Sequence, residues 1–368
     1  MGVRGTDAAP LVTICIVTGR RIPLLDACLA SLQRQVEPPT FELLICSDGD
    51  EDVAHAVRVR FPEARIRTVT RAFPGAARNV LLDDAHGELL LFLDDDVTVR
   101  PDLLARLGEL ARTHPDVDVF GGPNDSPESS SRFQFVQGAA MASMVGAGPV
   151  RRRYGAHPAG PADERFFILC NLAIRRRAML PFDPDLVCAE ENALLSEMSR
   201  RGIAMHYDPG LAVFHERRET FRGFGRQMYK YGRGRGQLMV RTPATRSPAY
   251  LAPSALVAYG LLAPAAVALT RGRARTAALA PLAAYAAAVG AGAVAIAATL
   301  RKPTTLPLAA ALIIELHVCY GAGVMRGLTE RQRIRDAPEV SPWFDAMPRS
   351  EPIEVPRSAS SRVLVEPA

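Results

Sequence analysis

An apolar stretch that ends in three successive carboxylates constrains this chain more than any other feature. The run Leu89–Leu93 holds only leucine and phenylalanine, and Asp94, Asp95 and Asp96 follow it directly. A continuous apolar run of this length is typical of a strand inside a parallel sheet, where both faces are covered. Open α/β sheets bind ligands at the carboxyl ends of their strands. Because Asp94 and Asp96 point to the same side of such a strand, the pattern predicts paired carboxylates at a binding edge.

Paired carboxylates at this place suit a divalent metal ion. Mg²⁺ and Mn²⁺ prefer hard oxygen ligands, keep several waters and commonly hold substrate phosphates as well. The structural alternative is an acidic turn that caps the next helix, a role for which Asp102 is a further candidate. The sequence favours the metal site.

Apolar runs alternate with helical periodicities along the first part of the chain. Strands are predicted at 11–17, 41–46, 66–69, 89–93, 117–120 and 166–174, and helices at 23–35, 51–60, 78–85, 101–113 and 190–201. Strands that alternate with helices indicate a parallel sheet with right-handed crossovers. With 368 residues, the chain has room for one α/β domain of about 230 residues and a second region.

The second region is hydrophobic. No charged residue occurs at 250–269 or 276–300, and each stretch reaches the ~20 residues that a membrane helix needs. A third stretch, 304–325, contains Glu315 and His317, which are costly in lipid unless they face a partner helix or a cavity. The sequence predicts two to three membrane helices, and buried helices of a soluble domain, rich in Ala and Gly, are the alternative. With three crossings the arginines at 271–275 would lie outside, against the positive-inside tendency.

Charge and cysteine usage fit a protein at the inner face of a membrane. The formal net charge of +5 comes almost entirely from arginine, much of it beside the apolar stretches. The six cysteines are scattered and form no CxxC pair, so neither disulfides nor zinc are expected. Residues 1–10 do not resemble a signal peptide. We expect a multi-pass protein of the plasma (inner) membrane whose large domain is cytoplasmic, and no nucleic acid among its partners.

Several short motifs follow one another between Leu11 and Gln237. They are VTICIVT at 12–18, Asp48-Gly49 after the second strand, GAARN at 75–79, the carboxylate triplet, Asn171 with Arg175 and Arg176, and AEEN at 189–192. In this order they resemble family-2 glycosyltransferases, inverting enzymes of the GT-A fold that use a nucleotide-activated sugar. The resemblance implies a GT-A nucleotide-diphospho-sugar transferase sheet followed by C-terminal transmembrane helices.

The resemblance also implies a catalytic pair and a metal site. Glu191, or its rival Glu190, would remove a proton from the acceptor hydroxyl as it attacks the anomeric carbon. Both glutamates could instead be helix-start carboxylates that interact with the helix dipole. Asp96 and Asp94, with His215, would hold Mn²⁺ or Mg²⁺ and so stabilise the leaving nucleoside diphosphate. His215 could equally be a core or loop histidine.

Donor and acceptor binding are assigned by the same resemblance. The donor-binding residues are Thr18, Asp48, Arg78, Asp94, Asp95, Arg226, Gln227 and Arg233. Asp48 can accept the ring N–H of uracil, and Arg78 can contact the base or a phosphate. Asn171 is the acceptor-binding residue. Two positions depart from the family pattern, because Ser47 stands where a first aspartate is usual and Glu191 where an aspartate is usual.

The segment 221–236, FRGFGRQMYKYGRGRG, is basic and amphipathic. Such a stretch is predicted to lie among lipid headgroups. It is similar to the corresponding segment of membrane-bound family-2 enzymes that build exopolysaccharide or lipid-linked sugars, including succinoglycan-type glycosyltransferases. The sequence lacks the QxxRW element of processive synthases, which favours the addition of one sugar at a time.

The predicted organisation has five parts: a disordered N-terminus (1–10), a GT-A catalytic domain (11–220), an amphipathic interfacial linker (221–249), a membrane domain (250–326) and a largely disordered tail (327–368). The expected function is transfer of a sugar from a nucleotide-diphosphate donor, with a UDP-sugar favoured, to a lipid-linked or glycan acceptor. Membrane lipid is the other expected partner.

Two other functions fit parts of the sequence. The sequence Asp94-Asp95-Asp96-Val97-Thr98 also fits the nucleophile strand of haloacid-dehalogenase-like phosphatases, in which Asp94 would be phosphorylated and Asp96 would act as acid and base. That class needs a downstream lysine, and only Lys230 is in range. The second alternative, an inactive membrane-anchored scaffold, would require neither the acidic triplet nor the glutamate pair.

Overall fold

The computed structural model describes residues 9–19, 21–47, 49–69, 73–186, 188–242 and 245–330, together with the backbone of 365–367. The chain divides into two compact units. We call them the sheet unit, which takes in Met1–Pro127, Ala156–Glu216 and Ala337–Ala368, and the helical unit, which takes in Glu128–Gly155 and Arg217–Asp336.

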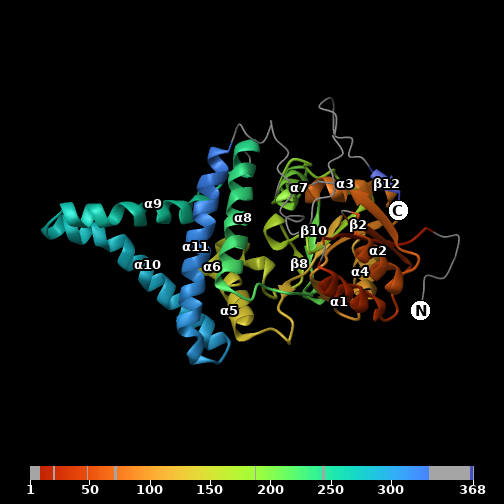
Figure 1. Ribbon diagram of the computed structural model, residues 1–368, viewed down its shortest axis with the longest axis horizontal. Helices are drawn as coiled ribbons and strands as arrows, with labels where there is room; N and C mark the ends of the chain where they lie inside the picture. The colour runs from red at the N-terminus through yellow and green to blue at the C-terminus, as the bar shows by residue number, and fades with distance from the viewer. Residues whose placement is uncertain are drawn as a thin grey trace. The chain divides into compact units, whose positions relative to one another are not determined.

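The sheet unit is built on a nine-stranded sheet of order β12-β3-β2-β1-β4-β9-β6-β10-β8 (Figure 1). Its strands are β1 (Val12–Val17), β2 (Phe41–Ser47), β3 (Arg65–Val69), β4 (Leu89–Asp94), β6 (Val119–Gly121), β8 (Gly160–Pro161), β9 (Asn171–Arg175), β10 (Met205–Tyr207) and β12 (Val365–Pro367). The first four strands run parallel, as the sequence predicts. The prediction of a wholly parallel sheet is wrong, because β9 runs antiparallel between β4 and β6.

The reversal at β9 follows from the connection that precedes it. Parallel neighbours need a crossover, usually one long helix, that returns the chain to the starting end. The chain between β6 and β9 instead leaves the sheet unit at Glu128 and rejoins it at Ala156, and it then passes through the 3₁₀ helix η2 (Glu164–Phe166), so no single helix packed on the sheet returns it to the starting end; the 3₁₀ helix η1 (Gly148–Arg153) belongs to the part outside the sheet unit. The strand predicted at 166–174 is accordingly shorter and begins at Asn171.

Helices cover both faces of the sheet. They are α1 (Ile22–Gln33), α2 (Glu51–Arg60), α3 (Pro74–Asp84), α4 (Leu103–Thr113) and α7 (Glu190–Arg200). On β1, Ile14 and Ile16 pack in the core shared with α1, α2 and α4, whereas Cys15 and Val17 pack in the core shared with α3 and α7. Two covered faces explain why the central strands are apolar at successive positions.

A small second sheet, of order β5-β11-β7, lies beyond the end of β4. Its strands are β5 (Val97–Val99), β7 (Asn124–Asp125) and β11 (Val213–His215). β11 runs antiparallel to β5, and His215 lies opposite Val97. This register carries His215 to the turn that contains the aspartates.

The helical unit contains the predicted apolar stretches as helices. Its members are α5 (Arg132–Met141), α6 (Met144–Ala147), α8 (Phe221–Arg241), α9 (Pro248–Leu269), α10 (Gly272–Thr299) and α11 (Leu306–Thr329), with the 3₁₀ helix η6 (Pro303–Thr305) before α11. The helices at 248–269, 272–299 and 303–329 are long and apolar enough to cross a membrane. α8 and α11 lie side by side (Figure 1).

The disorder predicted at both ends falls largely outside the described residues. In the C-terminal stretch, 327–329 belong to α11, and Val365–Pro367 form β12 against β3, a strand that the sequence pattern did not indicate. All six cysteines lie in the described ranges, and no disulfide bond joins any two of them.

Candidate active site at the carboxyl end of the sheet

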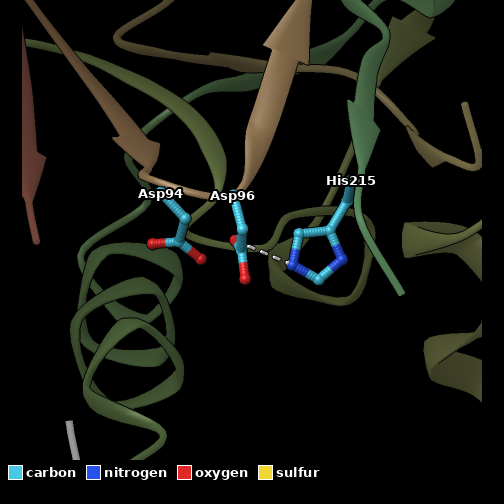
Figure 2. A group of neighbouring side chains, drawn as sticks. All are labelled: Asp94, Asp96 and His215. Atoms are coloured by element: carbon cyan, nitrogen blue, oxygen red, sulfur yellow. Dashed lines mark ion pairs between the residues drawn. The ribbon is translucent and has the colours of Figure 1, made fainter. Parts of the chain in front are cut away.

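The acidic triplet sits in the turn between β4 and β5. Figure 2 shows Asp94 and Asp96 directed toward the same side, with the His215 ring facing Asp96. One ligand atom from each of these three residues lies within 4.8 Å of the others. His215 Nε2 lies 3.1 Å from Asp96 Oδ1, and the backbone N–H of Glu216 donates to the Asp96 carbonyl at 2.9 Å. The structure thus brings together the three residues predicted to bind metal.

Burial acts on two carboxyl groups of the acidic triplet. It raises the pKa of Asp95 to about 6; Arg21 opposes this shift, and the neighbouring Asp96 acts in the same direction as burial. Burial also raises the pKa of Asp94, although the nearby Arg78 opposes the shift. Two carboxylates and an imidazole form a donor set that Mn²⁺ accepts, and a divalent cation would offset the clustered negative charge. The residues present therefore fit a metal ion.

Arg78 links the acidic triplet to the glutamate pair. Its guanidinium is 4% exposed and donates through Nη1 to Glu190 Oε1 at 2.7 Å and through Nη2 to Asp94 Oδ1 at 3.2 Å. The guanidinium carbon also lies 5.9 Å from the centre of the Phe182 ring. The predicted donor-binding arginine is thus a buried bridge between α3, the end of β4 and the start of α7.

The two candidate catalytic glutamates open α7 and have different surroundings. Glu190 is buried and engaged by Arg78, whereas Glu191 is half-buried and accepts a hydrogen bond from the Asn192 amide at 2.8 Å. Ala189 precedes them with φ 70° and ψ 22°, in the left-handed region. A non-glycine residue there is uncommon and holds the backbone turn in a conformation of higher energy. That turn directs the first residues of α7 toward Arg78.

Thr18 and Arg21 hold the middle of the triplet. Thr18 Oγ1 donates to Asp95 Oδ2 at 2.7 Å, so the side chain predicted to bind the donor also fixes the turn. Arg21 makes ion pairs with both Asp95 and Asp96. Sequence reasoning missed Arg21, and the available signal was its position just after β1, at the same sheet edge.

Other predicted site residues lie in different settings. Asn171 opens β9 opposite Leu93 and donates from Nδ2 to the Leu211 carbonyl, which anchors the chain just before β11. Asp102 occupies the N-cap position of α4, where its side chain pairs with Arg100. Asp48 lies outside the described residues.

The remaining predicted donor residues belong to α8 in the helical unit. Arg226 is exposed. Gln227 donates from Nε2 to the Tyr231 hydroxyl at 3.1 Å. Arg233 Nε donates to Glu330 Oε2 at 2.7 Å, and Gln237 donates to the same oxygen at 3.0 Å. The bonds that Arg233 and Gln237 make with Glu330 hold α8 to the end of α11.

The fold and part of the sequence are similar to those of known proteins. Among solved structures, the mannosyltransferase PcManGT from Pyrobaculum calidifontis, in complex with GDP-Man and Mn²⁺, superimposes with a TM-score of 0.61 at 17% identity over 89% of each chain. This likeness establishes the GT-A fold. Residues 13–180 match the family model Glycosyl transferase family 2, so the chain carries a family-2 glycosyltransferase domain.

Two curated relatives share this domain. The chain is 29% identical over 158 residues to the uncharacterized glycosyltransferase YwdF of Bacillus subtilis, covering 39% of this chain and 58% of the relative. It is 32% identical over 108 residues to the succinoglycan biosynthesis protein ExoO of Rhizobium meliloti, covering 28% of this chain and 31% of the relative. The chain thus spans about half or less of the length of the curated relatives that it matches.

Proposed function

We propose that the protein is an inverting, metal-dependent glycosyltransferase that moves one sugar at a time from a nucleoside-diphosphate donor to a lipid-linked or glycan acceptor. The observation that carries the proposal is the Asp94, Asp96 and His215 cluster at the carboxyl end of the sheet, joined through Arg78 to the glutamate pair of α7. A metal-ligand set beside a candidate base is the arrangement that diphosphate displacement requires.

The acidic cluster would receive the diphosphate of the donor. Asp96, Asp94 and His215 would hold Mn²⁺ or Mg²⁺, which when bound stabilises negative charge on the departing diphosphate. Thr18 and Arg21 keep the turn in shape through their contacts with Asp95 and Asp96. Arg78 and Asp48 would contact the nucleotide, with a UDP-sugar as the favoured donor. The GDP-Man and Mn²⁺ bound by PcManGT support a nucleotide-sugar donor in general terms.

Glu191 is the proposed base and Glu190 a positioning residue. Glu190 is committed to the buried ion pair with Arg78, so its carboxylate fixes the guanidinium rather than facing a substrate. Glu191 would take the proton of the acceptor hydroxyl while that oxygen attacks the anomeric carbon. The bond between that carbon and the phosphate oxygen breaks, its electron pair stays on the diphosphate, and the anomeric centre inverts.

The acceptor and the membrane belong to the same proposal. We place the catalytic domain (11–220) in the cytoplasm, at the plasma (inner) membrane to which the helices of 250–326 anchor it, with 221–249 as the interfacial link. Asn171 would approach the acceptor. The family match of 13–180 favours this reaction over the phosphatase alternative.

The test uses the full chain purified in detergent and a panel of nucleotide sugars, with and without Mn²⁺ or Mg²⁺. We expect Asp96→Asn to weaken metal-dependent donor binding at least tenfold. Glu191→Gln should keep donor binding and lower turnover by about 10²-fold or more, the usual contribution of a general base. The control Asp102→Asn changes an exposed carboxylate near the same edge and should alter neither quantity.

Two outcomes would overturn the proposal. One is donor binding that is indifferent to metal and to Asp96. The other is normal turnover by the Glu191→Gln enzyme. If, in addition, Glu190→Gln abolished turnover and left donor binding intact, the base would be Glu190. Retention or inversion of the anomeric centre is read from the product by nuclear magnetic resonance.

A further inference from the structure

The chain leaves the sheet unit at α8 and returns to it at β12. Val365–Pro367 pair antiparallel with β3 at the edge of the nine-stranded sheet, with Val365 opposite Val69. Among the described residues between these points, three helices are long and apolar enough to cross a membrane. The sequence of 331–364 is interrupted throughout by charged residues and prolines and contains no uncharged stretch of the ~20 residues that a crossing helix needs. Since β12 and β3 lie on one side of the bilayer, the number of crossings is even.

The start of α11 contacts a segment that stays on the side of the sheet unit. Glu128–Gly155 branches from the sheet unit after Pro127 and rejoins it at Ala156. This segment is shorter than the ~40 residues that two helical crossings need. Its Arg132 donates from Nη2 to the carbonyl of Thr304, just before α11. The N-terminal end of α11 therefore lies on the same side as the sheet unit.

The middle of α11 contacts the same segment. His317 Nε2 lies 2.8 Å from the Val145 carbonyl and 3.1 Å from the Gly146 carbonyl, so this nitrogen carries the proton and donates. Its Nδ1 accepts from the Tyr285 hydroxyl at 3.0 Å. A Cβ on Gly292 of α10 would lie 3.0 Å from Val145 Cβ, which shows how closely α6 packs there.

The C-terminal part of α11 packs against α8 at backbone distance. A Cβ on Gly323 would lie 2.1 Å from the Tyr229 carbonyl oxygen, and a Cβ on Gly327 would lie 2.1 Å from that of Arg233. On α8, Gly232 and Gly236 make the matching close approach to α11. Glycines four apart on both helices allow this contact.

The charge of α8 decides the depth of that contact. α8 carries six basic residues in 21 and no acidic one: Arg222, Arg226, Lys230, Arg233, Arg235 and Arg241. Each such charge costs several kcal/mol in the centre of a bilayer. α8 therefore stays out of the hydrocarbon, and the half of α11 packed against it stays out as well.

We infer that α9 and α10 form the membrane-crossing hairpin and that α11, with α8 and Glu128–Gly155, rests on the lipid headgroups on the side of the sheet unit. Leucines of the hairpin are strongly exposed, with Leu261 at 75%, Leu262 at 68% and Leu269 at 86%, as expected of a lipid-facing surface. The hairpin helices also contact each other, since the Tyr259 hydroxyl donates to the Ala278 carbonyl at 2.5 Å.

The headgroup-facing surface mixes apolar and basic side chains. Phe221 and Tyr229 of α8 and Met144 of α6 are exposed apolar residues, with Met144 at 60%, and Arg222 and Arg226 are exposed on α8. Apolar side chains beside arginines are typical of helices that lie in the headgroup layer of anionic membranes. The inference does not depend on the reaction that the sheet unit catalyses.

The test is the labelling of single cysteines in sealed membrane vesicles of both orientations. Each cysteine is introduced into a variant whose six native cysteines are replaced, and labelled with a membrane-impermeant maleimide. Thr304→Cys and Thr329→Cys mark the two ends of α11, Arg273→Cys marks the start of α10, and Ser199→Cys marks the sheet unit; all four positions are exposed. We expect positions 304, 329 and 199 to react from one face and position 273 from the opposite face.

Two results would overturn the inference. Labelling of positions 304 and 329 from opposite faces would make α11 a crossing helix. Labelling of position 273 from the same face as 199 would make the hairpin re-entrant. Trypsin treatment of vesicles that contain the unmodified chain tests independently which segments lie on each side of the membrane, because it needs no substitution. Trypsin on the side opposite the sheet unit should cut only at Arg271, Arg273 or Arg275.

Discussion

At the scale of single residues, buried charges are held by partners from distant parts of the sequence. Arg78 and Glu190 are 112 positions apart, and Arg21 and Asp96 are 75 apart. In each case a carboxylate that would be unfavourable alone in the interior gains a guanidinium. The candidate site is therefore also part of what stabilises the sheet unit.

Arg78→Met is expected to destabilise the protein by about 3–5 kcal/mol, because it leaves the buried Glu190 and the partly buried Asp94 without their shared cation. Urea unfolding of the full chain in detergent measures the change. The matched control is Arg100→Met, which breaks the exposed pair with Asp102 and should change stability by less than about 1 kcal/mol. Equal stability of the two variants would contradict the bridging role of Arg78.

His206 on β10 is expected to make stability depend on pH. Burial lowers the pKa of His206 below its ordinary 6.5. His114, whose ring centre lies 4.4 Å from that of His206, lowers this pKa further, as does Arg106, whereas Asp208 raises it. The unfolded chain then binds more protons than the folded one below pH 6.5. The stability that neutral His206 contributes is fully present above pH 6.5. It is lost as the pH falls below 6.5 toward the lower pKa that His206 has in the folded protein.

The measurement is the unfolding temperature between pH 7.5 and pH 5.5. His206→Phe keeps a ring beside Phe120 and should flatten the decline seen in the unmodified protein. His55→Phe, at an exposed position on α2, is the control and should leave the slope as it is. An unchanged slope in the His206 variant would assign the pH dependence to other groups.

At the scale of elements, α8 and α11 are joined through glycines rather than through large apolar side chains. The basic residues of α8 made an interfacial helix predictable from the sequence, but its partner was not, since glycine carries no periodic hydrophobic signal. The facing glycines become visible only when both helices are placed. They allow close van der Waals contact between the backbones of the two helices.

Gly323→Ala is expected to destabilise the helical unit by about 1–3 kcal/mol, since its Cβ would overlap the backbone of Tyr229 and neither helix can yield locally. The matched control is Gly290→Ala in α10, where an added Cβ meets nothing within 4 Å and alanine is the better helix former. Thermal unfolding in detergent compares the two variants. A Gly323→Ala protein as stable as the Gly290→Ala protein would refute close packing of α8 on α11.

At the scale of the whole molecule, membrane attachment is expected to depend on the exposed leucines of α9. A glutamate in the centre of a membrane helix costs about 3 kcal/mol. Leu261→Glu combined with Leu262→Glu should therefore move the protein from the carbonate-resistant membrane fraction to the extractable fraction. Val59→Glu, which changes an apolar residue of α2 that is 65% exposed, should leave fractionation unchanged. Retention of the double variant in carbonate-washed membranes would mean that α9 is not embedded in lipid.

The local sequence was sufficient for the features that depend on neighbouring residues. The apolar run of β4 followed by Asp94, Asp95 and Asp96 predicted a buried sheet strand that ends in carboxylates, and the uncharged stretches at 250–269 and 276–300 predicted long apolar helices. The order of short motifs indicated the family that the match of residues 13–180 shows. Each of these signals depends on side chains within one helix, strand or short motif, so periodicity and composition reveal it.

Only the tertiary structure decided which distant residues meet. It brought His215 to Asp96 through the β5–β11 pairing, placed Arg21 on the triplet, joined Arg78 to Glu190 and returned β12 to the edge of the sheet. It also reversed β9, which the alternation of strands and helices did not predict. Such contacts depend on chain reversals, register and backbone approach between segments far apart in sequence. A single sequence carries no periodic signal for them, because their free energy arises only when the segments are packed together.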